Sequence, residues 1–363
     1  MMREHYDVGV AGFWFGANYG SLLNGYAIYR TIKSFGKSVL MIHKPGDPTG
    51  DPELTQGHNV DFVRKYYDPK DVSPHYPYDR LHELNDRCDA FCAGSDQVWN
   101  YPISFDENMY LPFAEEGKRL LSFASSFGTA DGNIPAEASE RIGSYLRRFS
   151  AISVREKFAE RFLADRYGIS AETIIEPVFL LDEETIDQMI SASRFRPRDP
   201  YLLLYILDPT EKKREAIKRY VKALKMRAVT LLDGKHYLPD NDKRNIEMHD
   251  FAVPLGQAGC EEFLRAFHDA AFVITDSFHG TAFSLLFHKS FLSIGNPIRG
   301  RERFLDLLGR LGRTDRLIED PDEIPFDRRF LAPINYDETD RRIRQERAHA
   351  MAWLRRAFDA PLS

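Results

Sequence analysis

The feature that most constrains the fold is a repeated order of short apolar runs, small polar turns and amphipathic segments. Residues 8–11 form such an apolar run, and residues 22–35 carry apolar side chains at a period near 3.6. The same order returns in residues 201–206 and 211–224. Strands that alternate with helices predict parallel sheets covered on both faces, so we predict an α/β fold. Residues 43–80, rich in proline and without a clear period, are predicted to form a long loop.

The length of the chain, 363 residues, suits about two domains. The segment SASRFRPRDP, residues 191–200, is rich in arginine and proline and is a plausible linker. We predict a Rossmann-like domain at residues 1–190 and a second Rossmann-like domain at residues 198–337, facing each other across a cleft. A final helix within residues 338–363 is expected to pack on the body of the protein.

Charge and cysteine content argue against several classes of protein. Lys and Arg total 49 and Asp and Glu total 55, and this net charge of −6 disfavours a general nucleic-acid binder. The three cysteines are too few for a disulfide framework and fit a reducing compartment. The sequence has neither the apolar region of a secretory signal near its start nor an apolar stretch long enough to span a bilayer. We expect a cytoplasmic protein that binds no nucleic acid.

Residues 338–358 have an apolar helical face and six arginines. Two interpretations are open for this segment. The helix either packs on the body with its arginines in solvent, or it brings them to an anionic membrane surface. The second interpretation predicts peripheral contact with the inner face of the membrane.

Four polar turns stand where ligands bind in doubly wound sheets, beyond the carboxyl ends of strands. The first contains Asn18, Gly20 and Ser21. Its glycine allows close approach of the backbone, and the helix after it directs free N–H groups toward the cleft. A plain tight turn would have the same composition, so the pattern is compatible with an anion site or with a turn alone.

The second and third turns also follow predicted strands. Ser95, Asp96 and Gln97 could recognise sugar hydroxyls; the alternative is that Ser95 or Asp96 only caps the next turn. Arg155 carries a planar guanidinium that matches a carboxylate or a phosphate. The alternative for Arg155 is a structural ion pair with Glu156 or with an aspartate.

The fourth turn lies in TDSFHGTAFSLLF, residues 275–287, between two apolar segments. Asp276 or Ser277 could cap the helix that starts near Gly280, which explains part of the polarity. A cap does not need the imidazole of His279, which is the side chain best suited to proton transfer near neutral pH. His279 is therefore a candidate catalytic residue, although a lone histidine is also compatible with a structural role.

Signals for a metal site are weak. Residues 240–242 resemble a D-x-D metal motif, but no apolar strand precedes them and they are typical of a turn. Three arginines that follow residues 291–294 either add positive charge to the cleft or lie in a solvated loop; they are Arg299, Arg301 and Arg303. We predict that the site contains no metal.

The order of these motifs resembles the polysaccharide pyruvyl transferase family. The motifs are NYGSLLNGYAIYRTIKSFG, GSDQVWN, SFASSFG, ISVRE and TDSFHGTAFSLLF, in that order along the chain. Each is loose alone, but the five together, across residues 8–311, are fairly specific. The first loop lacks the N-R-G-D pattern of the more familiar branch of the family, which places this chain in another branch.

The resemblance implies a fold similar to GT-B glycosyltransferases, with residues 1–190 on the acceptor side. The implied reaction moves pyruvate from phosphoenolpyruvate onto two hydroxyls of one sugar of a bacterial surface polysaccharide, or of its lipid-linked precursor, and releases phosphate. Arg155 and His279 match the family's arginine and histidine, which implies a clamp for the donor's charge and a proton-transferring group. The residues expected to bind substrate are Asn18, Gly20, Ser21, Ser95, Asp96, Gln97, Asp276, Ser277, Gly280 and Thr281. Phosphoenolpyruvate is expected as a donor substrate, without a cofactor.

Two other functions are compatible with the sequence. A GT-B nucleotide-sugar glycosyltransferase would need a base pocket and a ribose-binding acid late in the second domain, where Glu319 and Asp320 are poor candidates. A non-catalytic member of the family would bind glycan, and this function would be favoured if Arg155 and His279 did not share one site.

Overall fold

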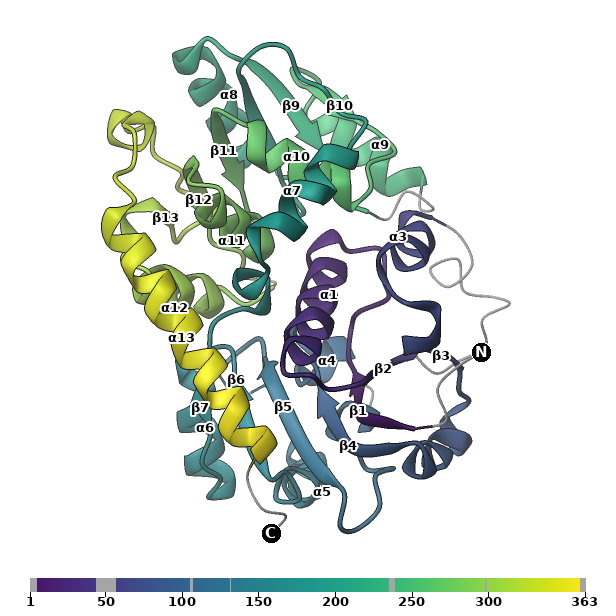
Figure 1. Cartoon of the computed structure of the whole chain (residues 1–363). Helices are drawn as coiled ribbons and strands as arrows, with labels where there is room; N and C mark the ends of the chain where they lie inside the picture. The colour runs from purple at the N-terminus through teal and green to yellow at the C-terminus, as the bar shows by residue number, and fades with distance from the viewer. Residues whose placement is uncertain are drawn as a thin grey trace.

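Two parallel β-sheets, each covered by helices, form the protein (Figure 1). The computed structural model describes residues 5–43, 57–104, 107–130, 132–234, 239–297 and 299–359. Within these residues the first sheet has seven strands, in the order β3-β2-β1-β4-β5-β6-β7, and the second has six, in the order β10-β9-β8-β11-β12-β13. All of their strand pairs are parallel. The predicted α/β fold with two Rossmann-like domains is confirmed.

The first sheet reverses its strand order between β1 and β4. Its strands are β1 (Tyr6–Ala11), β2 (Val39–His43), β3 (Val72–His75), β4 (Cys88–Ala93), β5 (Arg119–Ser125), β6 (Ala151–Val154) and β7 (Glu172–Thr173). The helices of this domain are α1 (Tyr19–Ser34), α3 (His58–Tyr66), α4 (Tyr101–Ser104), α5 (Ala136–Leu146) and α6 (Lys157–Tyr167). Val8 of β1 lies opposite both Val39 and Ala90. At such a switch point, the two neighbouring strands connect to helices on opposite faces of the sheet. A ligand site is therefore expected beyond the carboxyl ends of β1 and β4.

The second sheet has its switch point between β8 and β11. Its strands are β8 (Tyr201–Tyr205), β9 (Arg227–Leu231), β10 (Val253–Leu255), β11 (Phe272–Thr275), β12 (Ser290–Ile294) and β13 (Leu317–Ile318). The helices are α8 (Glu211–Leu224), α9 (Pro239–Met248), α10 (Cys260–Asp269), α11 (Phe278–Leu286) and α12 (Glu302–Arg310). All five residues of β8, YLLLY, are buried, as expected for a parallel strand covered on both faces.

Apolar packing continues from one domain into the other. The ring of Tyr19 in α1 lies 5.2 Å from the ring of Phe263 in α10, measured between centroids. The Tyr19 hydroxyl donates to the carbonyl of Ala258 at 3.1 Å. Full burial of one large apolar side chain contributes about 1.5–3 kcal/mol. This contact therefore helps to hold α1 beside the second domain.

The chain crosses between the domains earlier than the arginine-rich segment at residues 191–200. Helix α7 (Glu183–Ala192) follows the first sheet, yet it packs on α10 of the second domain (Figure 1). The backbone N–H of Arg194 then donates to the Glu262 carboxylate at 2.7 Å. The crossing therefore lies between β7 and α7.

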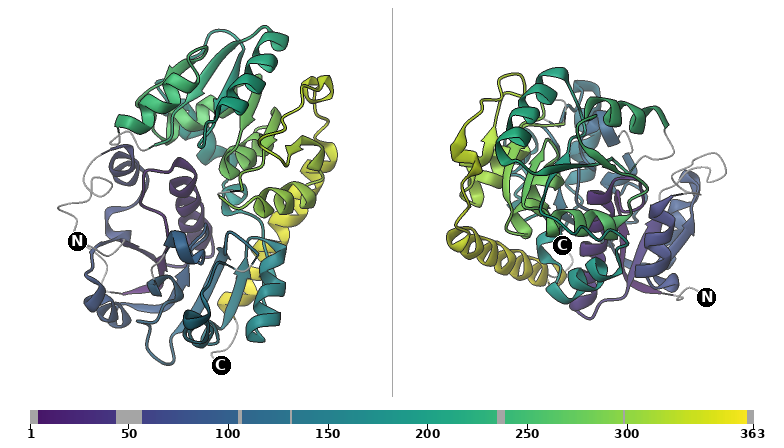
Figure 2. Two further views of the ribbon diagram at one scale, coloured as in Figure 1. Left: turned by 180° about the vertical axis from the view of Figure 1, so that it is seen from behind. Right: turned by 90° about the horizontal axis from the view of Figure 1, so that it is seen from above.

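Helix α13 (Asp337–Asp359) runs along both domains (Figure 2). Near its start, Asp340 lies 2.8 Å from Nε2 of His288 in the second domain. At its other end, Arg119 of β5 donates to the carbonyl of Phe358. The C-terminal helix thus contacts both sheets through their flanking residues.

Several arginines of α13 contact the rest of the protein. Arg356 lies 3.0 Å from Glu172, and Arg347 donates to the carbonyl of Leu181 at 3.4 Å. These contacts are those of a helix that packs on the protein. Within the described residues, no helix combines the length and the hydropathy that crossing a bilayer requires.

Part of the predicted loop at residues 43–80 has regular structure, so that prediction is wrong for this part. Helix α3 and strand β3 lie in it, and residues 44–56 fall outside the described residues. Phe62 of α3 is buried, and its ring lies 5.8 Å from the ring of Tyr26. Tertiary packing stabilises a short helix that its own sequence pattern does not predict.

Candidate active site

The N-terminal turns of α1 and α11 meet at the interface between the domains. Helix α1 follows β1 and α11 follows β11, so each starts at the switch point of its sheet. His279, the second residue of α11, lies against Gly20 of α1, where an added β-carbon would overlap the imidazole ring. Only glycine allows a backbone to approach a side chain this closely. The first and the fourth predicted turns therefore come together.

The residues next to His279 build the turn that presents it. Ser277 caps α11, because its Oγ accepts a hydrogen bond from the N–H of Gly280 at 3.2 Å. Gly280 packs so closely on Thr275 that a β-carbon would overlap the hydroxyl of that residue. Thr281 donates its hydroxyl to the carbonyl of Ser277 at 3.1 Å. Ser277, Gly280 and Thr281 thus fix the backbone that carries His279.

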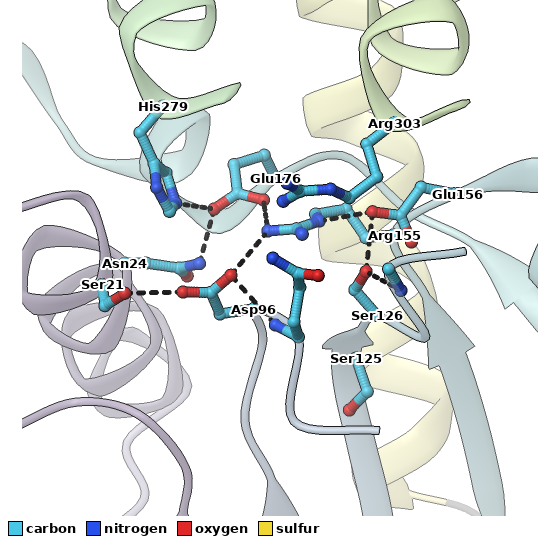
Figure 3. A network of polar contacts seen from close by, with 12 residues as sticks. Ser21, Asn24, Asp96, Ser125, Ser126, Arg155, Glu156, Glu176, His279 and Arg303 are labelled. Atoms are coloured by element: carbon cyan, nitrogen blue, oxygen red, sulfur yellow. Dashed lines mark hydrogen bonds and ion pairs between the residues drawn. The ribbon is translucent and has the colours of Figure 1, made fainter. Parts of the chain in front are cut away.

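Glu176, from the segment that crosses between the domains, joins His279 to Arg155 (Figure 3). Its Oε1 lies 3.4 Å from Nε2 of His279 and accepts a hydrogen bond from Nδ2 of Asn24 at 2.5 Å. Its Oε2 accepts a hydrogen bond from Nη1 of Arg155 at 2.9 Å. Arg155, Glu176 and His279 are only 2%, 1% and 6% exposed. The two predicted catalytic residues therefore share one buried network.

Asp96 ties the second turn to the same network. Its Oδ2 accepts a hydrogen bond from the hydroxyl of Ser21 at 2.6 Å, and its Oδ1 lies 3.5 Å from Nη1 of Arg155. The Asp96 backbone is left-handed, with φ of 73°, a conformation that aspartate tolerates because its side chain can bond locally. Here Oδ1 accepts the N–H of Gln97 at 2.9 Å. Ser21, Asp96 and Arg155 connect three of the four predicted turns.

Two guanidinium groups pack on the ring of Phe278. The Cζ atoms of Arg155 and Arg303 lie 4.4 and 5.1 Å from the ring centroid. Arg155 also donates from Nε to Glu156 at 2.7 Å, and Ser126 donates to the same Glu156 oxygen at 2.9 Å. Nη2 of Arg155 and Nε of Arg303 are buried and have no hydrogen-bond partner among the described residues. The site thus contains two buried cationic donors that can serve a further acceptor.

The three carboxylates around Arg155 differ in their pKa. Burial opposes the ionisation of Asp96 and Glu176, but neighbouring cations, Arg155 among them, more than offset it and lower both pKa values. Burial raises the pKa of Glu156, although Arg155 opposes the shift. Burial and the charge of Arg155 lower the pKa of Arg303 to about 10. An anion beside the two guanidiniums would offset their repulsion.

A family model described as polysaccharide pyruvyl transferase matches residues 18–297. The chain belongs to the polysaccharide pyruvyl transferase family. The matched segment starts at the cap of α1 and contains every network residue named above except Arg303. This pyruvyl transferase is therefore an enzyme of the transferase class, and the predicted resemblance is confirmed. A sequence search against curated proteins gave no match.

Solved structures with the same fold include two epimerases and a polymerase. UDP-GlcNAc 2-epimerase from Neisseria meningitidis, bound to UDP-GlcNAc, is 11% identical with a TM-score of 0.53, covering 94% of this chain and 99% of that one. UDP-GlcNAc 2-epimerase from Methanocaldococcus jannaschii is 12% identical with a TM-score of 0.52, covering 93% and 91%. The wall teichoic acid polymerase TagF is 11% identical with a TM-score of 0.50, covering 98% and 89%. These likenesses show a shared GT-B-like fold.

Two residues predicted to bind substrate in this pyruvyl transferase have structural partners. Asp276 is fully buried; it accepts the N–H of Leu207 at 2.6 Å and Nζ of Lys213 at 2.7 Å. It therefore holds the turn after β8 and makes no ion pair or hydrogen bond with His279. Asn18 caps α1, accepting the N–H of Ser21 at 3.1 Å.

The remaining predicted residues lie beside Asp96. The side-chain oxygen of Gln97 accepts a hydrogen bond from Asn100 at 2.7 Å, so local structure engages it. Ser95 is buried, and its hydroxyl has no hydrogen-bond partner among the described residues. The hydroxyl of Ser95 can therefore form a hydrogen bond with a substrate oxygen. The side-chain oxygen of Gln97 could do so only by giving up its hydrogen bond with Asn100.

The sequence prediction missed Glu176 and Asn24. Glu176 follows the buried pair Ile174 and Ile175 and precedes Pro177. A polar residue that follows an apolar run is the same kind of signal that marked the predicted turns. Asn24 gives no such signal, because it lies within a helix among apolar neighbours.

Metal binding is not indicated by the geometry of the site. In the part of the chain that the structure describes, no group of three or more His, Cys, Asp or Glu side chains is arranged to hold a metal ion. Cys88, Cys92 and Cys260 are buried free thiols. That the reaction needs no metal and no cofactor stays a prediction.

Gly20→Ala is expected to lower the turnover of this pyruvyl transferase about 100-fold, because the new methyl group occupies the space of the His279 ring. Overpacking of this kind also costs about 1–3 kcal/mol of folding stability. Turnover and the free energy of unfolding should both be measured. Gly309→Ala is the matched control, since Gly309 lies in α12 with open space at its β-position. Equal turnover in the two variants would contradict the close contact at Gly20.

Proposed function

We propose that this pyruvyl transferase moves pyruvate from phosphoenolpyruvate onto two hydroxyls of one sugar in a bacterial surface polysaccharide or its lipid-linked precursor. The observation that carries the proposal is the pair of buried guanidiniums, Arg155 and Arg303, which keep free donors beside the ring of Phe278, the residue before His279. Phosphoenolpyruvate has a carboxylate and a phosphate, and planar guanidiniums suit both groups. The protein would act in the cytoplasm, and at the inner face of the membrane when the acceptor is lipid-linked.

Helix N-termini support an anionic donor. Four network residues belong to the start of a helix: Ser21 in α1, Glu156 at the cap of α6, His279 in α11 and Arg303 in α12. Each helix start carries a partial positive charge and N–H groups without helical partners. Their convergence favours a substrate with more than one negative group.

His279 is the candidate for proton transfer in this reaction. A proton added to C3 of the enol makes a methyl group and leaves an oxocarbenium-like centre at C2. One sugar hydroxyl attacks C2 and gives up its proton, so that His279 gives one proton and takes one. The bond from C2 to the phosphate oxygen then breaks, and a second hydroxyl attacks C2. Its proton leaves with the phosphate, which balances the formation of the ketal.

Arg155 and Arg303 would bind the donor and stabilise charge as it moves to the departing phosphate. Ser21 of α1 and Asp96, which bond to each other, form the part of the network nearest α1 and are the candidates for binding the acceptor hydroxyls. Asp96 is held ionised by its cationic neighbours, since its pKa is lowered in spite of burial. An ionised carboxylate accepts hydrogen bonds from sugar hydroxyls well.

Incubation with phosphoenolpyruvate and a panel of synthetic and lipid-linked sugars tests the proposal. We expect phosphate release that depends on the acceptor, with one acceptor gaining the mass of a pyruvate ketal. A nucleotide-sugar panel serves as the comparison. Turnover of a nucleotide sugar without turnover of phosphoenolpyruvate would make the protein a glycosyltransferase and would refute the proposal.

A further inference from the structure

We infer that Glu176 is a positioning residue for His279, holding the Nε2 side of the ring so that Nδ1 exchanges protons with the substrates. The inference rests on the proposed function. It assigns a role to a carboxylate that lies outside the four turns and on the segment between the domains. It also assigns different roles to the two nitrogens of the imidazole.

The first argument is the placement of the two carboxylate oxygens. Oε1 of Glu176 serves the Nε2 side of His279 and Nδ2 of Asn24, whereas Oε2 serves Nη1 of Arg155. Neither oxygen is left for solvent, since Glu176 is only 1% exposed. At 3.4 Å, Nε2 of His279 and Oε1 of Glu176 are at ion-pair distance but do not form a hydrogen bond in this structure. Catalytic hydrogen bonds are often long before substrate binds and shorten in the complex.

The second argument is the rigidity of Glu176. It occupies the position directly before the short helix η4 (Pro177–Leu180), which starts with a proline of fixed φ. Asn24 and Arg155, from two other elements of the first domain, hold the carboxylate. A side chain fixed by its backbone and by two partners can orient a ring on the opposite domain.

The third argument is the confinement of the ring. Gly20, which has no side chain, lies against the Cγ and Nδ1 side of the imidazole, and the ring of Phe278 is 5.7 Å away on the same helix as His279. The Nε2 atom is buried and has no hydrogen-bond partner among the described residues, and Oε1 of Glu176, at 3.4 Å, is an acceptor close to it. With Nε2 held toward Glu176, Nδ1 is the nitrogen left for exchange with a substrate.

The charges around His279 agree with this assignment. Glu176 faces it from the crossing segment and Asp96 from the turn after β4, while the cations Arg155 and Arg303 lie beyond the two acids. The pKa of Glu176 is lowered in spite of burial, because Arg155 and His279 favour its ionised form. An ionised carboxylate on one nitrogen fixes the tautomer of a histidine and stabilises the imidazolium that forms during turnover.

The role of Glu176 follows from the proton balance. His279 enters the cycle as the imidazolium, gives its Nδ1 proton to C3 of the donor and takes a proton back from a sugar hydroxyl at the same nitrogen. The Nε2 proton stays on the ring throughout, directed at Glu176. Loss of the carboxylate would allow the other tautomer, in which Nδ1 already carries a proton and cannot take one.

Glu176→Gln tests the inference, with Glu172→Gln as the matched control. Glu172 also contacts an arginine and a histidine, Arg356 at 3.0 Å and His349 at 3.6 Å, but it lies at the surface with its side chain 44% exposed. In Glu176→Gln we expect kcat to fall about 100-fold with KM for phosphoenolpyruvate changed less than about threefold. Glu176→Asp, which keeps the charge, should recover part of the loss. Glu172→Gln should match the wild type.

A readout that needs no turnover separates this inference from the proposed function. The nitrogen chemical shifts of His279, in full-length protein labelled with ¹⁵N in histidine, report which ring nitrogen carries the proton. At a pH at which the ring is neutral, we expect the proton on Nε2 in the wild type and a changed pattern in Glu176→Gln. Unchanged ring signals, or a kcat equal to that of the wild type, would overturn the role of Glu176. Absence of phosphoenolpyruvate turnover in the wild type would instead overturn the proposed function, and the ring signals would still decide the pairing.

Discussion

His279→Asn is expected to lower the rate of phosphate release about 10²–10⁴-fold, the range that one general acid–base group supplies. Asparagine keeps polarity and fits the space of the imidazole, but it neither gives nor takes a proton at neutral pH. The substituted residue lies in the first turn of α11, whose cap depends on Ser277 and Gly280. The helix start should therefore persist, and the variant should unfold near the temperature of the wild type.

His288→Asn is the control for this substitution. His288 also contacts an acid, Asp340 at 2.8 Å, but its side chain is 54% exposed and it lies at the other end of α11. Its loss should leave turnover unchanged within about threefold, because an exposed ion pair contributes little. The comparison is made by initial rates at saturating phosphoenolpyruvate together with thermal unfolding. If His279→Asn kept most of the activity while folded, proton transfer by His279 would be wrong.

Arg155→Met is expected to destabilise the protein by about 3–5 kcal/mol, the usual consequence of breaking a buried ion-pair network at one partner. Methionine fills a similar volume, so the loss is chiefly electrostatic. Glu156, Glu176 and Asp96 would remain buried without the cation that they share. Turnover should also be lost, because the variant lacks a guanidinium of the proposed donor site.

The difference in folding stability between the wild type and Arg155→Met should become smaller as the pH falls. Asp96 and Glu176 have lowered pKa values in the folded protein, so each stabilises it above its unfolded value of about 4. This contribution is lost as the pH falls through the folded values. The gap between wild type and Arg155→Met should therefore be largest near neutral pH and should shrink in acid.

Denaturant unfolding at two pH values measures this effect, with Arg356→Met as the control. Arg356 pairs with Glu172 at the surface, where its side chain is 58% exposed, and its loss should cost less than about 1 kcal/mol. A small, pH-independent loss in Arg155→Met would mean that the three carboxylates do not depend on this arginine.

Much of the active site is predictable because it lies at the ends of strands. Carboxyl ends of parallel strands meet at one edge of a sheet, so turns far apart in sequence converge there. Ser21, Asp96, Arg155 and His279 follow this rule. Their residue types also suit the proposed reaction, since it needs a cation to bind the donor and an imidazole to transfer protons.

The residues that the sequence could not place depend on the relative position of the domains or on distant partners. Glu176 reaches His279 because the crossing segment passes the start of α11. Asp276 is the opposite case, because it was predicted to bind substrate but has a structural partner. Its carboxylate accepts a hydrogen bond from Lys213, which lies on a helix far away in the sequence. A local pattern can mark both acids as polar residues that follow apolar runs, but it does not show which partner each one reaches.

The fold itself was largely predictable from periodicity, and its exceptions have a physical cause. All five residues of β8 are buried and apolar, which marks a central strand without any further information. Strand β3 is short, contains a proline and lies at the sheet edge, where such strands are tolerated but hard to recognise. Helix α3 forms because Phe62 packs on the body.

Helix α13 sets the way in which substrates can reach the buried network. The domains are joined by the crossing before α7 and by this helix, so a rotation that exposes His279 must bend α13 or detach one end. The end beside the first sheet is held partly by the exposed pair of Arg356 and Glu172. Such a pair contributes at most about 1 kcal/mol and weakens in salt. We therefore expect the attachment of this end, and with it substrate access, to depend more on other contacts, such as the hydrogen bond from Arg119 to the carbonyl of Phe358.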